Sequence, residues 1–391
     1  MKSQFLLNPE ITYLNHGSFG ACPKPVFEEY QKWQLELERE PVQFITVKGP
    51  KLLKNSREAL ADFINCHADD VVYVPNPSTA YNIIVKNLKL NVGDEILSTN
   101  HEYGAMDRTW NYYCRKSGAK YIQQKISIPL LSKEQFIEEF WKGLTPKTKI
   151  VFISQITSPT ALIFPAKEIC ERAKELGLMT IVDGAHVPHH INLDLATLKA
   201  DIYTGACHKW MLTPKGCSFL YVKKELQNQF DPLIISWGYE SDYPSHSQFL
   251  DYHEFNGTRD FSAYLTVPKA LEFLAENNWV EKRKQCRQLI RETYLELCDF
   301  MHTKPICTVS DDFLGQMCSI PIKSSDVLKL KATLYNKYKI EIPVIKTLLD
   351  FEGNTNQQFI RVSAQVYNSK EDMQTLKNAL GDIRKKSNLL E

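Results

Sequence analysis

The chain has 391 residues, of which 43% are hydrophobic and 24% are charged, which is ordinary for a globular protein with a sizeable core. Lys and Arg number 47 against 46 for Asp and Glu, so the formal net charge is only +1. This balance gives no electrostatic reason to expect nucleic acid or an anionic membrane surface as a partner. The length favours two or three domain-sized units.

The sequence shows no targeting or membrane-spanning segment. Met1–Glu10 carries a single lysine and a short apolar patch, whereas a secretory signal needs a longer apolar region. No stretch approaches the roughly 18 to 20 apolar residues that span a bilayer. The ten cysteines are scattered, with no Cys-x-x-Cys pair, as is typical of reduced thiols. We therefore expect a cytoplasmic protein without a metal centre.

From about residue 68 the sequence alternates between short apolar runs and helix-patterned stretches. Pro165 and Gly177 flank one such stretch, as is typical of the start and the end of a helix. Strands that alternate with helices predict an α/β fold, with a mostly parallel sheet covered on both faces. The predicted strands are Val71–Pro75, Asp94–Ser98, Tyr121–Ile128, Lys149–Ser154, Leu178–Asp183, Asp201–Gly205 and Ser218–Val222, and the helices are Thr79–Leu88, Ala105–Ser117, Lys133–Lys142 and Ala166–Leu176.

After about residue 260 the pattern changes to longer helices with fewer strands, which predicts a smaller α+β domain. We expect an N-terminal segment (1–20) near the functional site, a large domain (21–262) and a small C-terminal domain (263–391). The predicted helices are Leu265–Asn277, Val280–His302, Ser325–Tyr338 and Lys370–Leu380, and the predicted strands are Met317–Ile322, Ile340–Pro343 and Gln358–Ser363.

Two of the predicted strands end in polar side chains. Asp183 and His186 follow one strand, and Lys209 follows the next. Ligands of open α/β sheets bind at the carboxyl ends of strands, where a carboxylate can pair with a protonated heterocyclic nitrogen. A lysine between His208 and Trp210 can react with an aldehyde as a free amine, because partial burial lowers its pKa. The alternatives are a turn-forming Asp and a surface Lys.

Two further features add to this set. Ser78 and Thr79 open a predicted helix, where hydroxyls and free backbone N–H groups could bind phosphate or simply cap the helix. Arg361 could grip an α-carboxylate through two parallel hydrogen bonds, or form a surface ion pair. An amine for an aldehyde, a carboxylate for a pyridinium, a phosphate cap and a carboxylate clamp together indicate a pyridoxal-phosphate (PLP) enzyme that acts on an amino acid.

Several longer motifs carry a resemblance to a known family. The chain resembles the class V aminotransferase superfamily of fold-type I PLP-dependent transferases, and within it the isopenicillin N epimerase-like group. The matching stretches are Tyr13–Gly20, Asn100–Ala105, Thr157–Ala161, Asp183–His186, Cys207–Trp210, Pro214–Gly216, Gly257–Asp260 and Arg361–Asn368.

The resemblance implies roles around the cofactor ring. Lys209 would hold PLP as a Schiff base and later move the proton of the substrate Cα. Asp183 would keep the pyridine nitrogen protonated, and His186 and Gln155 would contact the phenolic oxygen. The remaining implied roles are phosphate binding by Ser78, Thr79 and His208, with Thr258 donated across a homodimer interface; stacking on the ring by Tyr103, with His101 as competitor; carboxylate binding by Arg361; and a substrate entrance lined by Asn15, His16 and Gly17.

The cofactor residues leave the reaction open among epimerisation, transamination and β-elimination. We expect epimerase or racemase chemistry because the resemblance is closest there, with a C–S lyase or an aminotransferase as alternatives. The stretch Tyr338–Ile360 contains no cysteine, which argues against a desulfurase that uses a cysteine nucleophile on a mobile loop. A binding or scaffold protein that has lost activity is the alternative of another class, and the retained Lys209, Asp183 and Arg361 argue against it.

Two assignments have competing interpretations. A racemising enzyme needs an acid or base opposite Lys209, and Tyr103, His101 or His16 could serve, although each could also merely stack or hydrogen-bond. Ile235–Phe255 carries Trp237, Tyr239, Tyr243 and Tyr252, which could shape the substrate pocket or pack at a dimer interface.

Overall fold

The computed structural model describes residues 1–347, 350–351, 354–355 and 357–391. Within these residues the main sheet has seven strands, in the order β2-β8-β7-β6-β5-β3-β4. The five strands from β3 to β7 run parallel, whereas β8 pairs antiparallel with both β2 and β7, which confirms a mostly parallel α/β sheet. The strands are β2 (Val71–Val74), β3 (Glu95–Thr99), β4 (Lys120–Gln124), β5 (Thr148–Ser154), β6 (Met179–Gly184), β7 (Ile202–Ala206) and β8 (Ser218–Val222).

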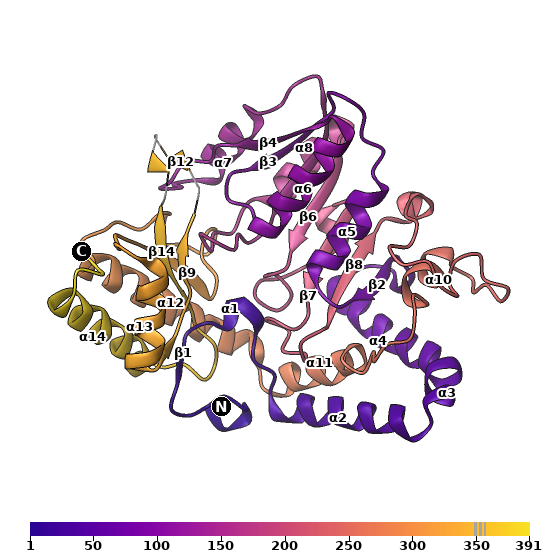
Figure 1. Ribbon diagram of the computed structural model, residues 1–391, viewed down its shortest axis with the longest axis horizontal. Coiled ribbons are helices and arrows are strands. Elements are labelled where there is room, and N and C mark those ends of the chain that lie inside the picture. Colours follow the sequence, from indigo (N-terminus) through magenta and orange to yellow (C-terminus); the bar gives the residue numbers. More distant parts are fainter. Residues whose placement is uncertain (348–349, 352–353, 356) are drawn as a thin grey trace.

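Both faces of this sheet are buried, because successive side chains of a strand point to opposite sides. Phe152 of β5 packs in one core cluster with Trp110, whereas its neighbour Val151 packs in the other with Ile169. Helices α5 (Pro77–Asn87) and α6 (Gly104–Ser117) supply the first cluster, and α4 (Gly49–Ile64), α7 (Lys133–Trp141) and α8 (Ala166–Glu175) supply the second. In Figure 1, α5 and α6 lie in front of the sheet.

The sequence analysis assigned no elements before residue 68, where the chain forms long helices. Helix α2 (Lys24–Arg39) begins after Pro23, and with α3 (Pro41–Gln43) it borders the molecule below the sheet in Figure 1. Helix α11 (Val267–Glu276) packs against α2 and α4. This helix follows the predicted domain boundary at residue 262, yet it packs with helices that precede that boundary.

The second unit is built on a three-stranded antiparallel sheet in the order β11-β14-β9. Helix α12 (Trp279–Phe300) packs on β9, and α14 packs on α12. The strand that was predicted at Ile340–Pro343 is observed only over its first two residues, as β10 (Ile340–Glu341). The remaining elements are β9 (Met317–Ile322), α13 (Val327–Tyr338), β11 (Val344–Lys346), β14 (Gln358–Ser363) and α14 (Lys370–Lys386), together with β12 (Asp350–Phe351) and β13 (Asn354–Thr355).

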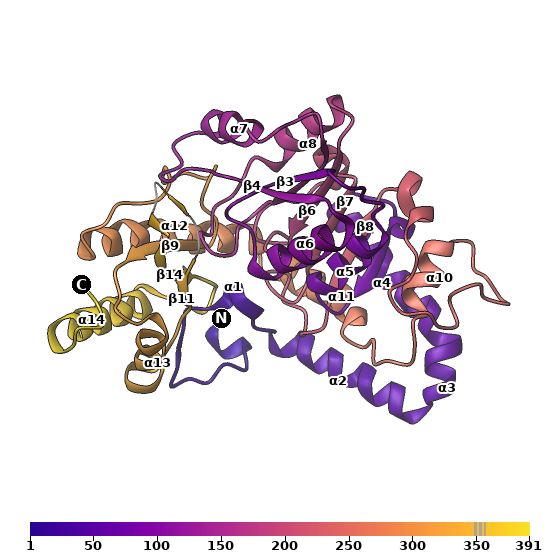
Figure 2. The same ribbon diagram turned by 45° about the horizontal axis from the view of Figure 1, so that its top comes forward.

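The N-terminal segment connects the two sheets. Strand β1 (Thr12–Tyr13) pairs with β10 in parallel, and the Gly17 N–H donates to Ser363 Oγ of β14 at 3.2 Å. Helix α1 (His16–Phe19) therefore lies between the two units, as both views show (Figures 1 and 2). A side chain on α1 can thus reach residues of either unit.

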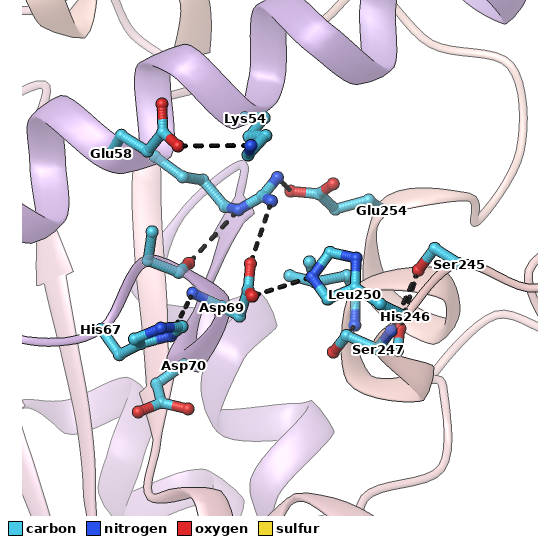
Figure 3. A network of polar contacts seen from close by, with 12 residues as sticks. Lys54, Glu58, His67, Asp69, Asp70, Ser245, His246, Ser247, Leu250 and Glu254 are labelled. Carbon is cyan, nitrogen blue, oxygen red and sulfur yellow. Dashed lines mark hydrogen bonds and ion pairs between the residues drawn. The ribbon is translucent and has the colours of Figure 1, made fainter.

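Helix α10 (Gln248–Glu254) forms inside the aromatic stretch Ile235–Phe255. Arg57 of α4 holds it through an ion pair with Glu254 at 2.6 Å. His246 and Asp69 lie beside this pair and are 2.8 Å apart (Figure 3). The segment before α10 is strongly exposed, at 86% for Trp237. None of the helices in the described part of the chain has the length and apolar character that a membrane span requires.

Candidate active site

The polar strand ends of the main sheet open into one cavity of about 490 Å³. The carboxyl ends of β2, β5, β6 and β7 share an edge with the start of β8, since β8 runs in the opposite direction. The lining residues are Gly17, Ser18, Phe19, Pro75, Asn76, Pro77, Ser78, Tyr103, Ser154, Ile156, Ser158, Asp183, Ala185, His186, His208, Lys209, Lys215, Gly216 and Arg361.

Lys209 is one of these lining residues and lies three residues after β7. Its Nζ is 3.1 Å from Nε2 of His186. Burial and, to a smaller extent, the Arg361 guanidinium lower the pKa of Lys209 to about 7, while Asp183 acts in the opposite direction. A free amine is therefore abundant at neutral pH, as a nucleophile for an aldehyde requires.

His16 holds the backbone of Lys209 in place. Its Nε2 lies 3.0 Å from Lys209 O and its Nδ1 lies 2.7 Å from the Tyr367 hydroxyl, while the ring packs on Trp210. Burial lowers the pKa of His16 to about 3, so the imidazole is neutral. Both ring nitrogens of His16 are engaged, and His16 is not among the residues that line the described cavity, although the resemblance implied a place at the substrate entrance.

Asp183 and His186 occupy the end of β6. The Asp183 carboxylate accepts a hydrogen bond from Ala185 N at 2.8 Å, and burial raises its pKa. Burial and the charge of Lys209 lower the pKa of His186 well below its ordinary value. Its Nδ1 is buried and finds no hydrogen-bond partner among the described residues. Such an atom on a cavity wall indicates that a polar ligand completes the site.

The opening turn of α5 presents only some of its predicted side chains to the cavity. Asn76 Oδ1 accepts hydrogen bonds from Thr79 N at 2.9 Å and from Thr79 Oγ1 at 3.2 Å, so this pair caps the helix. Ser78 lines the cavity, and so does His208 across the turn that follows β7. The sequence analysis had proposed Thr79 as a phosphate ligand, but its hydroxyl is engaged in the cap.

Arg361 enters the cavity from β14 of the second unit. Its Nη1 donates to Ser158 O at 2.6 Å and to Ser158 Oγ at 3.1 Å, and its Nη2 donates to Ser18 Oγ at 3.0 Å. Its buried Nε has no partner within the described chain. These contacts fix the plane of the guanidinium and leave donors for an incoming carboxylate.

Tyr103 and His101 lie in different environments, although both were candidates to stack on the ring. Tyr103 precedes α6 and lines the cavity. Burial lowers the pKa of Arg361 to about 10, and the nearby Tyr103 acts in the opposite direction. His101 is completely buried, with Nδ1 3.0 Å from Thr160 Oγ1 and Nε2 3.0 Å from Ile126 O. Because both nitrogens face other partners, His101 is not placed to stack over a ligand in the cavity.

Three other predicted residues lie outside the lining of the described cavity. Gln155 Oε1 accepts from the Tyr203 hydroxyl at 3.0 Å, and the backbone N–H of Gln155 donates to Asp183 O at 2.8 Å. Asn15 Oδ1 accepts from Ser18 Oγ and thereby orders a residue that does line it. Thr258 lies exposed in the turn after α10.

The sequence analysis assigned no role to several lining residues. Ser18 and Ser158 hold the guanidinium, and Lys215 lies in the turn before β8. Ser158 and Lys215 belong to motifs that carry the family resemblance. Their position after or before a strand at the functional edge was the available signal, but Ser and Lys are too common in loops to stand out.

Comparison with known proteins gives a consistent result. The family model "Aminotransferase class-V" matches residues 21–376. Isopenicillin N epimerase of Amycolatopsis lactamdurans is 30% identical over 397 aligned residues, which cover 98% of this chain and 98% of that protein. A probable chloroplastic L-cysteine desulfhydrase of Arabidopsis thaliana is 28% identical, over 96% of this chain and 83% of that protein.

Solved structures share the fold at lower identity. The apo structure of a cysteine desulfurase from Thermococcus onnurineus has a TM-score of 0.83 at 19% identity, over 98% of this chain and 97% of that chain. The cystine C–S lyase C-DES, in complex with cysteine persulfide, has a TM-score of 0.79 at 20% identity, over 96% and 98% of the two chains. At these identities the likeness establishes the fold and leaves the reaction open.

Proposed function

Because the chain belongs to the class-V aminotransferase family and is a PLP-dependent enzyme, we propose that it acts at the Cα of an amino acid as an epimerase or racemase. The observation that carries the amino-acid part is that the half-buried Lys209 and the buried Arg361 line one cavity. A reactive amine and a fixed guanidinium lie where an amino acid presents its amine and its carboxylate.

The residues present fit PLP. Lys209 offers an amine for the aldehyde, Asp183 a buried carboxylate for the pyridine nitrogen, and Ser78 a helix start for the phosphate. Nδ1 of His186, which has no hydrogen-bond partner among the described residues, can bond to a polar group of the cofactor. When bound, PLP supplies a ring that stabilises negative charge at the substrate Cα.

Each side chain then has a role that follows from its position. Arg361 orients the substrate through its carboxylate, and Lys209 removes the Cα proton as a free amine. Asp183 keeps the pyridine nitrogen protonated, because a buried carboxylate favours a cationic partner. Tyr103 lines the same cavity and would lie over the ring, where its phenol is the candidate to return a proton on the face opposite Lys209.

The epimerase relatives favour proton return over loss of a side-chain substituent. The second candidate is a C–S lyase, which several L-cysteine desulfhydrase relatives favour. A desulfurase with a cysteine nucleophile is less well supported, since 338–360 contains no cysteine, although part of that stretch lies outside the described residues. An aminotransferase is the third alternative.

We also propose that the enzyme is a cytoplasmic homodimer. Within each chain, the domain boundaries lie near residues 20 and 262. Thr258 is exposed and does not line the described cavity of its own chain, so a phosphate contact would come from a second copy. The exposed Trp237 and Tyr243 suit the same interface better than the substrate pocket.

The deciding experiment is proton NMR of the PLP-loaded protein in heavy water with L- and D-amino acids, including cysteine derivatives. Deuterium at Cα together with the opposite enantiomer supports the epimerase. Pyruvate, ammonia and a sulfur product would instead identify a lyase, and a 2-oxo acid an aminotransferase. Lys209→Ala is the control and should lose exchange and bound chromophore. Exchange that persists in this variant would contradict the assignment of Lys209.

A further inference from the structure

Lys215 lies between the two elements that flank the proposed phosphate site. Strand β8 pairs with β2 in a register that matches Val74 to Ser218, and the same register continued places Lys215 and Gly216 beside the start of α5. On its other side β8 pairs with β7, which matches Ala206 to Ser218 and brings the turn around His208 alongside. Lys215 lines the cavity at this point and, like the control residue used below, is exposed to solvent.

The other groups at this end of the cavity carry no positive charge. His208 Nδ1 lies 2.9 Å from Cys217 O, and because a carbonyl only accepts, this nitrogen carries the proton. Burial lowers the pKa of His208 to about 4, so the ring is neutral at pH 7. Ser78 and the first turn of α5 offer neutral donors. A phosphate dianion bound here would gain its charge complement from Lys215 alone among these groups.

Among the residues that the structure describes, no carboxylate forms an ion pair with Lys215. Partial burial lowers the pKa of Lys215, and Cys22 acts in the opposite direction. Arg361 is the other cation that lines the cavity besides Lys209, and it is held by Ser158 and Ser18. In addition to burial, the charge of Arg361 lowers the pKa of Lys209. The charge of Lys215 instead adds to the effect of burial on the pKa of His208 and His16, which it also lowers.

We propose that Lys215 binds the phosphate of PLP, as the cation of a cradle whose other members are the first turn of α5 and His208. The proposal deepens the proposed function and rests on it, because it assigns a residue to the same cofactor site. The alternative for an unpaired lysine on this wall is a second anionic group of the substrate, and the experiment below distinguishes the two.

The test measures the dissociation constants of PLP and of pyridoxal, which lacks the phosphate, for the apo-protein. Lys215→Gln should weaken PLP by about 10- to 100-fold, the usual effect of losing one charged hydrogen bond. Pyridoxal binding should stay within about twofold, which also shows that the variant is folded. Lys215→Arg should restore most of the PLP affinity, because a guanidinium also binds phosphate.

Lys224→Gln is the matched control, because Lys224 flanks the other end of β8 and is exposed. It makes the same change of charge and should leave both constants unchanged. Phosphorus-31 NMR of bound PLP should show a higher phosphate pKa in Lys215→Gln than in Lys224→Gln, since a nearby cation favours the dianion.

Three results would overturn the proposal. Lys215→Gln could bind PLP as tightly as the parent protein, or could lose PLP and pyridoxal equally. It could also leave the PLP constant unchanged while raising KM only for substrates with a second anionic group, which would assign Lys215 to the substrate. If the parent protein itself bound no PLP, the proposed function would fail first.

Discussion

Nζ of Lys209 lies 3.1 Å from Nε2 of His186, and burial lowers the pKa of both side chains. The imidazole is therefore neutral, and the lysine titrates at about 7, far below the ordinary value of about 10.4. The site keeps its nucleophile ready without a permanent positive charge beside the substrate amine. This relationship makes the reactivity of Lys209 steeply dependent on pH around neutrality.

The rate at which the apo-protein captures PLP should follow this titration. Only the free amine attacks, so below pH 7 the rate should fall about tenfold per pH unit, and above it the rate should level off. Arg361→Gln should move the midpoint upward, because Arg361 is the charge that lowers the pKa of Lys209. Stopped-flow absorbance across pH 5 to 10 measures both. A midpoint near that of an exposed lysine would contradict the buried environment.

Arg361→Lys should reduce kcat/KM for an amino acid by about 10- to 100-fold, because a lysine cannot form two parallel hydrogen bonds to a carboxylate. Most of the loss should appear in KM, and PLP should remain bound. The amine that corresponds to the same amino acid without its carboxylate should react equally with the parent protein and with Arg361→Lys. Arg39→Lys, an exposed residue on α2 that pairs with Glu36, is the control. Equal losses for acid and amine would assign Arg361 a structural role.

Gly20→Ala should disrupt the turn that carries His208 and Lys209. Gly20 has a φ of +69°, and a Cβ there would lie 2.1 Å from His208 O and 2.9 Å from Lys209 Cα. Gly177 has nearly the same φ, +68°, with open space around it, so Gly177→Ala isolates the backbone strain of about 1 to 2 kcal/mol.

The additional clash should bring the destabilisation of Gly20→Ala to about 3 kcal/mol or more and weaken PLP binding. Urea denaturation and the PLP dissociation constant measure the two effects. Similar stability losses in both variants would show that the turn around Lys209 yields without strain.

The α/β class and the main strands were predictable because their signals are local. Apolar runs such as 149–154 and 178–183 match β5 and β6 closely, and they end in the polar residues that form the site. Helix α2 carried a weaker signal, because Glu, Lys and Gln outnumber its apolar side chains and only Val26 and Leu37 are buried. Which residues of α2 are buried depends on its packing against α11, which is far away in the sequence.

Within the site, sequence patterns identified the residue types better than their directions. His101 and Tyr103 are two positions apart, yet one is buried among Thr160 and Ile126 and the other faces the cavity. That difference depends on where the chain turns after β3, because a side chain follows its local backbone direction. Likewise Ser158 acts on Arg361, a residue more than two hundred positions away, and this contact is fixed only when the two units meet.

The ion pair that anchors α10 should contribute far more to stability than its exposed neighbour (Figure 3). The side chains of Arg57 and Glu254 are only 3% and 5% exposed, with Nη1 and Oε1 2.6 Å apart. Arg57→Gln leaves the Glu254 carboxylate buried without its cation, and the free energy of unfolding should fall by about 3 to 5 kcal/mol. Urea denaturation, followed by tryptophan fluorescence, measures the change.

Lys54→Gln is the control on the same helix, because Lys54 pairs with Glu58 at 3.5 Å while both side chains are about half exposed. Its loss should cost no more than about 0.5 kcal/mol. Burial raises the pKa of Glu254, which Arg57 counteracts, so in Arg57→Gln the carboxyl should take up a proton more readily. The stability deficit of Arg57→Gln should therefore shrink as the pH falls from 7 toward 5. A deficit equal to that of Lys54→Gln at pH 7 would mean that solvent reaches Glu254 and that α10 is held by its apolar contacts alone.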